Sequence, residues 1–329
     1  MSVMLQLDDV SKTYKVGAFG GQRLVAVRDV SFDVAAGEVV SLIGESGSGK
    51  STIGKMILRL SPVTTGAIRF DGNDVSRLKG RALKEYYRRV QGVFQDPFSS
   101  YNPIFKADRV FKMIKDEFFP HVARSEWEQK LEESLDAVSL DPVQVLHKYP
   151  HQLSGGQLQR LLVARALLLD IRFLVADEII SMLDASTRID VLNLLADLKA
   201  RGLGVLFITH DLSLGNYISD RTVILRRGLI VEMGATAKVF GNPQHAYTRM
   251  LLASVPQLHR TWEEVATELE TTPVEAIDSR LKVAYARTAA ALEHDDPTDS
   301  ALVEFEDGHL VRRYESAAGR TAPVAGEAA

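Results

Sequence analysis

The sequence has no cysteine, no excess of basic residues and no long apolar run. Without cysteine it forms no disulfides, thiolate metal sites or cysteine-ligated iron–sulfur clusters, and it has no cysteine nucleophile. Its formal net charge of -4 argues against a nucleic-acid partner, because phosphate backbones select basic surfaces. No window reaches about 18 uninterrupted apolar residues, so work at a membrane is expected to go through a partner.

The pattern of the remaining residues predicts an α/β protein. Of the 329 residues, 46% are hydrophobic and 25% are charged, which is ordinary globular composition. Apolar strands such as Val39–Ile43, Phe173–Ala176 and Val205–Thr209 alternate with helical patterns. This alternation predicts a largely parallel sheet covered by helices on both faces. A helix over about Thr187–Arg201 places on one face Ile189, Leu192, Leu195 and Ala196.

The composition shifts after residue 256, so we expect a large domain at 1–256 and an extension at 257–329. Within the extension, Trp262–His294 is charged and predicted to be helical in parts. Leu302–Arg313 alternates around an Asp-Gly pair, which is typical of a β-hairpin. The small and polar residues Ser316–Ala329 predict a disordered tail.

A phosphate-binding loop is the clearest chemical motif. The segment from Gly44 to Ser51 matches G-x-x-x-x-G-K-[ST] in full, between an apolar strand and a helical pattern. Its glycines let backbone N–H groups form an anion nest, and the next helix adds its positive end. Lys50 is expected to reach the β and γ phosphates, and the Ser51 hydroxyl to ligate Mg²⁺. The predicted ATP-binding residues of this segment are Gly44, Glu45, Ser46, Gly47, Ser48, Gly49, Lys50, Ser51 and Thr52.

Two carboxylates, Asp177 and Glu178, end the apolar strand Phe173–Ala176. At the carboxyl edge of a parallel sheet they are expected beside the phosphate loop. Asp177 is then expected to hold Mg²⁺, directly or through water, and Glu178 to orient and deprotonate the attacking water. An acidic turn or helix start is the alternative, and the phosphate loop disfavours it.

Two glycines, Gly155 and Gly156, lie in the first turn of a predicted helix. Ser154 and Gln157 form an S-x-x-Q capping box at this helix start. Glycine in a first turn lowers helix stability, which makes sense if a ligand approaches the backbone closely. An anion at a helix N-terminus is the natural candidate, and capping and phosphate binding are compatible.

In this order, the motifs resemble the ATP-binding subunits of ABC transporters. The likeness runs from about Leu5 to Pro256, and Leu153–Gln157 corresponds to the family's signature sequence. It implies a P-loop ABC ATPase with a mostly parallel sheet core and an N-terminal antiparallel β part. It also implies an inserted helical subdomain at about 97–170 and a small C-terminal α+β extension.

The resemblance gives roles to residues that are unremarkable alone. It implies that Tyr14 stacks on adenine, that Gln95 senses Mg²⁺ and the attacking water near the membrane subunit, and that His210 contacts the γ phosphate. Ser181–Asp184 matches the D-loop. ATP is then expected in a head-to-tail cassette dimer, between one phosphate loop and the signature helix of the other cassette.

A narrower likeness points to the dipeptide/oligopeptide importer group. Val93–Pro103 looks like the glutamine loop of that group, and Asn242–Thr248 looks like its His-Pro-Tyr-Thr segment, with Ala246 where proline is usual. Where the family reads Asp-Glu-Pro-Thr-Ser-Ala-Leu-Asp, this chain has Ile179, Ile180 and Met182 in place of proline, threonine and alanine. We expect altered D-loop packing but retained activity, because the carboxylates, Lys50 and His210 are intact.

The sequence therefore predicts an ATP-hydrolysing, Mg²⁺-dependent importer subunit. The leading prediction for the imported solute is a di- or oligopeptide. Importers of oligosaccharides or nickel-type chelates remain alternatives, as does a soluble ABC ATPase acting on ribosomes or DNA. The implied partners are a second cassette, two membrane-spanning permease subunits and an extracytoplasmic solute-binding protein, with no nucleic acid. The implied location is the cytoplasmic face of the cell membrane. The hairpin near 302–313 could pair with the partner cassette, cover a sheet edge or regulate.

Overall fold

A computed structural model of the chain describes residues 2–16, 21–181, 183–253 and 300–314. It divides into two compact units, of which the first runs to Leu229 and the second begins at Ile230. The predictions for Trp262–His294 and for the tail from Ser316 lie outside the described residues. In the described ranges, no helix is both long enough and apolar enough to cross a membrane.

A parallel sheet forms the centre of the first unit, and its neighbouring strands follow the order β9-β3-β8-β7-β6. β3, β7 and β8 are buried at every position, as their continuous apolar sequences predict for strands covered on both faces. Because the strands are parallel, their carboxyl ends meet at one edge. The strands are β3 (Val39–Ile43), β6 (Val90–Val93), β7 (Phe173–Asp177), β8 (Gly204–Thr209) and β9 (Arg221–Arg226).

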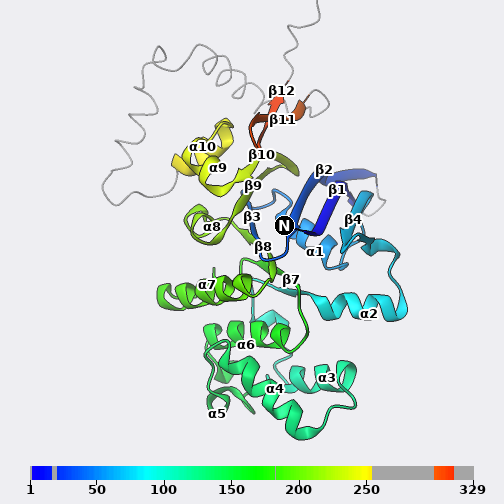
Figure 1. Cartoon of the computed structure of the whole chain (residues 1–329), viewed down its shortest axis with the longest axis vertical. Coiled ribbons are helices and arrows are strands. Elements are labelled where there is room, and N and C mark those ends of the chain that lie inside the picture. Colours follow the sequence, from blue (N-terminus) through cyan, green and yellow to red (C-terminus); the bar gives the residue numbers. More distant parts are fainter. Residues whose placement is uncertain (1, 17–20, 182, 254–299, 315–329) are drawn as a thin grey trace, which may run out of the picture. The chain divides into compact units, whose positions relative to one another are not determined.

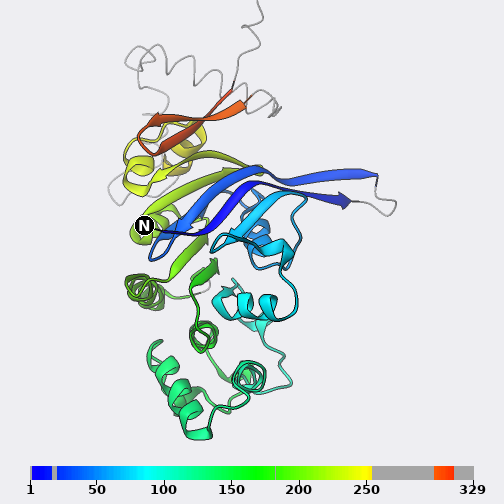
Figure 2. The ribbon, with the colours of Figure 1, turned by 45° about the vertical axis from the view of Figure 1, so that its right-hand side comes forward.

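The N-terminal strands form a separate antiparallel sheet in the order β2-β1-β4-β5. In Figure 2, β1 and β2 run side by side as a long ribbon, and the pairing shifts register at several points along it. This sheet is the antiparallel part that the resemblance implied. Its strands are β1 (Val3–Val16), β2 (Gln22–Ala35), β4 (Thr65–Phe70) and β5 (Asn73–Asp74).

The helices of the first unit include a group inserted between β6 and β7. In Figure 1, α3 to α6 gather on one side of β7, which agrees with the expected helical subdomain. Short 3₁₀ turns connect several elements at Val75–Arg77, Phe98–Ser100 and Pro150–Gln152. The helices are α1 (Lys50–Ile57), α2 (Gly80–Arg89), α3 (Arg109–Phe118), α4 (Arg124–Asp136), α5 (Pro142–Val145), α6 (Gly155–Leu167), α7 (Ala185–Ala200) and α8 (Leu212–Ile218).

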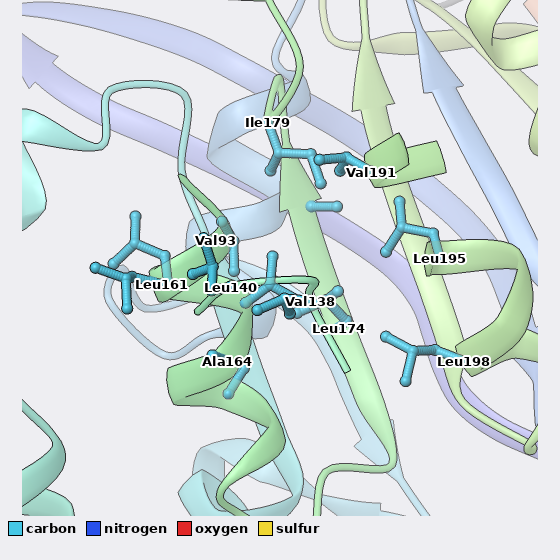
Figure 3. Packing of buried hydrophobic residues seen from close by; sticks show 14 of the residues in the cluster. Val93, Val138, Leu140, Leu161, Ala164, Leu174, Ile179, Val191, Leu195 and Leu198 are labelled. Atoms are coloured by element: carbon cyan, nitrogen blue, oxygen red, sulfur yellow. The ribbon is translucent and has the colours of Figure 1, made fainter. Parts of the chain in front are cut away.

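A hydrophobic cluster joins these helices to the sheet. Figure 3 shows Leu174 of β7 between Leu161 and Ala164 of α6 on one side and Leu195 of α7 on the other. All four side chains are 0% exposed. Burial of this apolar surface is the main source of stability for the arrangement, and it fixes α6 and α7 against the strand that carries Asp177.

The buried face of α7 differs from the predicted one. Val191, Leu192 and Leu195 are fully buried, whereas Ile189 is 45% exposed and Ala196 is exposed. Leu192 and Leu195 belong to both stripes, so periodicity alone does not decide between them. The cluster around β7 selects the stripe that contains Val191.

The second unit contains the predicted hairpin. β11 (Ser300–Glu306) and β12 (His309–Tyr314) pair antiparallel, and β12 continues the sheet by pairing with β10 (Leu229–Ala235). Of the three roles left open for the hairpin, covering a sheet edge is the one that the structure shows. The helices here are α9 (Thr236–Gly241) and α10 (Ala246–Ala253).

A buried acid ties this unit together. Glu232 of β10 is 0% exposed, and its carboxylate accepts hydrogen bonds from the backbone N–H groups of Gln244 and His245 at 2.7 and 2.9 Å. The Nε2 atom of the fully buried His309 lies 2.8 Å from the same carboxylate. These contacts join β10, the segment before α10 and the hairpin, as polar burial requires.

Candidate functional site

The phosphate loop lies between β3 and α1, as its sequence predicts. The Lys50 ammonium donates hydrogen bonds to the carbonyl oxygens of Gly44 and Glu45, at 2.6 and 2.8 Å. Lys50 is 4% exposed, and burial lowers its pKa, while the carboxylates of Glu178 and Asp177 oppose that shift. The loop is therefore held closed around a buried cation that faces two carboxylates.

Two loop glycines lie so close to the backbone of neighbouring strands that a side chain would not fit. Gly49 has φ of 107°, and a Cβ there would lie 2.5 Å from the carbonyl oxygen of Ala26 on β2. At Gly44, a Cβ would lie 2.1 Å from the carbonyl oxygen of Leu225 on β9. Both contacts are with backbone, which cannot turn aside, so neither position accepts a side chain without movement of the loop.

We predict that Gly49→Ala weakens ATP binding by at least about tenfold and lowers thermal stability, because both the left-handed φ and the clash with Ala26 displace the loop. Gly72→Ala is the matched control. Gly72 also has a left-handed φ, of 75°, but its Cβ would meet nothing within 4 Å. Calorimetric titration with ATP and thermal unfolding of both variants check this. Equal ATP affinity in the two variants would contradict it.

Asp177, at the end of β7, lies beside the phosphate loop. The Ser51 hydroxyl donates a hydrogen bond to its Oδ1 atom at 3.3 Å. Burial raises the pKa of Asp177, and the Ser51 hydrogen bond opposes that shift. A hydroxyl next to a carboxylate is an oxygen donor pair suited to Mg²⁺, which takes one or two carboxylates together with waters and phosphate oxygens. The residues therefore fit the ion that the sequence implied.

Glu178 and His210 face each other across the ends of β7 and β8. His210 Nδ1 lies 3.2 Å from Glu178 Oε1, and the Glu178 side chain is 18% exposed against 60% for His210. Glu178 has φ of 51°, a left-handed conformation that costs free energy in a non-glycine residue. Its N–H donates to the carbonyl oxygen of Ile208, and Ser181 donates to its carbonyl through both N–H and hydroxyl. These bonds hold the strained backbone that aims the carboxylate.

A cavity of about 680 Å³ connects these groups. It is open to solvent at the carboxyl edge of the sheet, where ligands of α/β proteins bind. Leu24 and Ala26 of β2 line it, although no sequence motif had singled them out. Leu24 reaches the cavity because β1 pairs with β2, which places Leu24 opposite Tyr14. The other lining residues are Tyr14, Ser46, Gly47, Gly49, Lys50, Ser51, Thr52, Gln95, Glu178 and His210.

The signature segment does not line this cavity. Ser154 caps α6, its hydroxyl accepting from the Gln157 N–H at 3.1 Å while the Gln157 side chain accepts from the Ser154 N–H at 2.9 Å, which confirms the capping box. Gly155 and Gly156 form the first turn of α6. ATP is expected to lie between the phosphate loop and a signature segment. Within one chain, the phosphate loop lines the cavity and the signature segment does not.

Side chains of α6 donate hydrogen bonds to β6 and to the residue that follows it, just before Gln95. Arg165 donates to the carbonyl oxygen of Gly92 at 2.8 Å, and Gln159 donates to that of Phe94 at 3.4 Å. Burial lowers the pKa of Arg165, and nearby Tyr101 opposes that shift. The sequence analysis did not single out Arg165 or Gln159, because their role depends on contacts between distant segments.

Ile179 and Ile180 point into the protein. They are 1% and 2% exposed and belong to the cluster around β7, and Figure 3 shows Ile179 beside Val191. Ile179 and Ile180, which stand where the family has proline and threonine, therefore extend the core. Met182 of the predicted D-loop lies outside the described residues, and Asp184 caps α7 by accepting from the Thr187 N–H at 3.0 Å.

Comparison with known proteins identifies the family. A family model described as ABC transporter matches residues 27–181, and one described as oligopeptide/dipeptide transporter, C-terminal region, matches residues 231–280. The oligopeptide transport ATP-binding protein OppF of Streptococcus mutans is 38% identical over 285 residues, which are 84% of this chain and 89% of that protein. The chain belongs to the ABC transporter ATP-binding proteins.

Further relatives of this ABC ATPase agree. The dipeptide transport ATP-binding protein DppF of Lactococcus lactis subsp. cremoris is 39% identical over 280 residues, with 84% of this chain and 89% of that protein covered. Among solved structures, the dimeric ATP-binding cassette MJ0796 bound to ADP and Pi has a TM-score of 0.64 and 29% identity. The match covers 71% of this chain and 99% of the cassette. The ABC ATPase thus has the nucleotide-binding fold of its family and carries the C-terminal region of the oligopeptide/dipeptide group.

Proposed function

We propose that this ABC ATPase powers the import of di- or oligopeptides. The observation that carries the proposal is that one cavity is lined by Lys50, from the start of α1, and by Gln95, Glu178 and His210, which follow β6, β7 and β8. Together with a C-terminal region matched at 231–280, this supports an active hydrolase in a peptide importer rather than a nucleotide-binding scaffold.

We propose one role for each side chain, and for Tyr14, Gln95 and His210 the role is the one that the family resemblance implies. Lys50 binds the β and γ phosphates, and the N–H groups of the loop surround them. Ser51, Asp177 and Gln95 would hold Mg²⁺, which would neutralise phosphate charge. Glu178 orients the attacking water and accepts its proton, while His210 leaves Glu178 to contact the γ phosphate. Tyr14 stacks on adenine.

A second cassette completes the site. The signature residues Ser154, Gly155, Gly156 and Gln157 lie outside the cavity of their own chain, at the start of α6. We propose that they bind the γ phosphate held by the phosphate loop of the partner cassette, through the N–H groups of the first helical turn. The dimer then acts on two permease subunits at the cytoplasmic face of the membrane, with a binding protein outside.

We also propose that residues 1–256 act as the nucleotide-binding domain and 257–329 as an extension. The pairing of β12 with β10 makes the hairpin part of the sheet in the second unit. Its removal is therefore expected to expose the edge of β10.

Reconstitution tests the substrate. The chain is co-purified with its membrane subunits and binding protein, placed in liposomes and assayed for ATPase stimulated by peptides, oligosaccharides and nickel chelates. Stimulation and uptake with di- or oligopeptides are expected, and both should vanish in the Glu178→Gln complex. Stimulation by a saccharide or chelate alone, or co-purification with ribosomes or DNA instead of membrane subunits, would overturn the peptide importer.

A further inference from the structure

One part of the cavity wall is apolar and comes from the β1–β2 ribbon. Tyr14 of β1 pairs with Leu24 of β2, and Ala26 follows two residues along β2. The pairing shifts register at Ala26, which has no partner residue on β1. All three line the cavity. This wall is where a flat base can stack.

Lys12 is buried next to this wall. It lies two residues before Tyr14 on β1, is 7% exposed, and places its Nζ atom 4.9 Å from the centroid of the Tyr14 ring. The same ammonium donates a hydrogen bond of 2.6 Å to the carbonyl oxygen of Pro62, in the loop after α1. Among the described residues that line the cavity, Tyr14 is present and Lys12 is not.

Two consequences follow from this placement. The Pro62 carbonyl fixes the ammonium, and the ammonium attracts the electron-rich face of the ring, so the orientation of Tyr14 is set before any nucleotide arrives. The cation also draws π-electron density toward itself. Stacking on a ring polarised in this way is more favourable for adenine, because repulsion between the two π faces is reduced.

We infer that Lys12 is a positioning residue for adenine: its buried ammonium holds and polarises Tyr14 from the side away from the cavity, so that the opposite face receives the base. The inference rests on the proposed stacking of Tyr14 on adenine. It gives Lys12 a part in selecting a nucleoside triphosphate over other polyphosphates, which the phosphate loop by itself binds without regard to a base.

The test compares ATP with inorganic tripolyphosphate, which has the phosphates but no base. Lys12→Met keeps an unbranched stem and removes the charge. For the purified full chain, we expect ATP to bind about three- to tenfold more weakly and its KM to rise similarly, with kcat within about twofold. Tripolyphosphate affinity should not change. Lys12→Arg, which keeps the charge, should restore most of the ATP affinity.

Lys15→Met is the matched control, since Lys15 is an exposed residue of the same strand. Equal weakening of ATP and tripolyphosphate by Lys12→Met would overturn the inference, because it would indicate general damage to the fold. Unchanged ATP affinity would overturn it too. Thermal unfolding of each variant shows whether the fold is kept, and the Arg variant decides the question if the Met variant unfolds.

A double-mutant cycle with Tyr14→Ala separates this inference from the function on which it rests. If Lys12 acts through Tyr14, adding Lys12→Met to Tyr14→Ala costs no further ATP affinity. Additive losses would overturn the inference and leave Tyr14 stacking intact. If Tyr14→Ala alone leaves ATP affinity unchanged, the proposed stacking fails and the role of Lys12 fails with it.

Discussion

Glu178→Gln is expected to lower the ATPase kcat by about 10²- to 10⁴-fold, the usual contribution of a general base, while ATP affinity stays within a few-fold. Glutamine has the shape of glutamate, so the left-handed backbone at Glu178 and its bonds to Ile208 and Ser181 are retained. Only the proton acceptor is lost. Steady-state phosphate release and calorimetric ATP binding on the same preparation check the two halves of this prediction.

Glu132→Gln is the control for this change. Glu132 is an exposed residue of α4, and its replacement also removes one carboxylate from the chain. Its ATPase should equal that of the unaltered protein. Hydrolysis at more than about a tenth of the normal rate in Glu178→Gln would show that another group accepts the proton.

Lys50→Ala is expected to weaken ATP binding by about 10- to 100-fold, since hydrogen bonds to charged groups are worth about 1.5–3 kcal/mol. The same ammonium also donates hydrogen bonds to the carbonyls of Gly44 and Glu45 within the loop. Its removal therefore affects the loop before nucleotide arrives as well as the contact with the phosphates. Titration with ATP and with ADP measures this, and ADP should lose less because it has no γ phosphate.

The control lies on the same helix. Lys55 is exposed on α1, so Lys55→Ala removes a cation from α1 without touching the loop, and its ATP affinity should change by less than about threefold. If Lys50→Ala bound ATP as well as Lys55→Ala does, the loop would hold phosphate by its backbone N–H groups alone. That result would contradict the role given to Lys50.

Ile179 and Ile180 follow directly after Glu178, so their packing matters for ATP hydrolysis. Ile179 and Ile180 lie in the core of their own chain, where they fill space beside α7. Ile179 and Ile180, which depart from the family pattern, thus belong to the internal packing directly after Glu178. Retained hydrolysis is the expectation, because the Glu178 carboxylate still faces the cavity and His210.

What the sequence determined alone was local chemistry. The spacing from Gly44 to Ser51 needs no long-range contact, because backbone N–H groups and a helix start form the anion nest within eight residues. The capping box of Ser154 and Gln157 is local in the same way. The order of the strands also placed Asp177 beside the loop, since parallel strands end at one edge of their sheet.

Only the tertiary structure decided which side chains from distant segments meet. The stripe of α7 that contains Val191 is buried because β7 packs there, and helical periodicity does not choose it. The left-handed backbone of Glu178 depends on a bond from its N–H to β8. The place of Leu24 in the cavity and the contact of the Lys12 ammonium with the Tyr14 ring follow from strand pairing and from the Pro62 loop. Such contacts join residues that are far apart in the chain. Their energies depend on the distances and angles between those residues in the folded protein, which cannot be read from composition or from motif spacing.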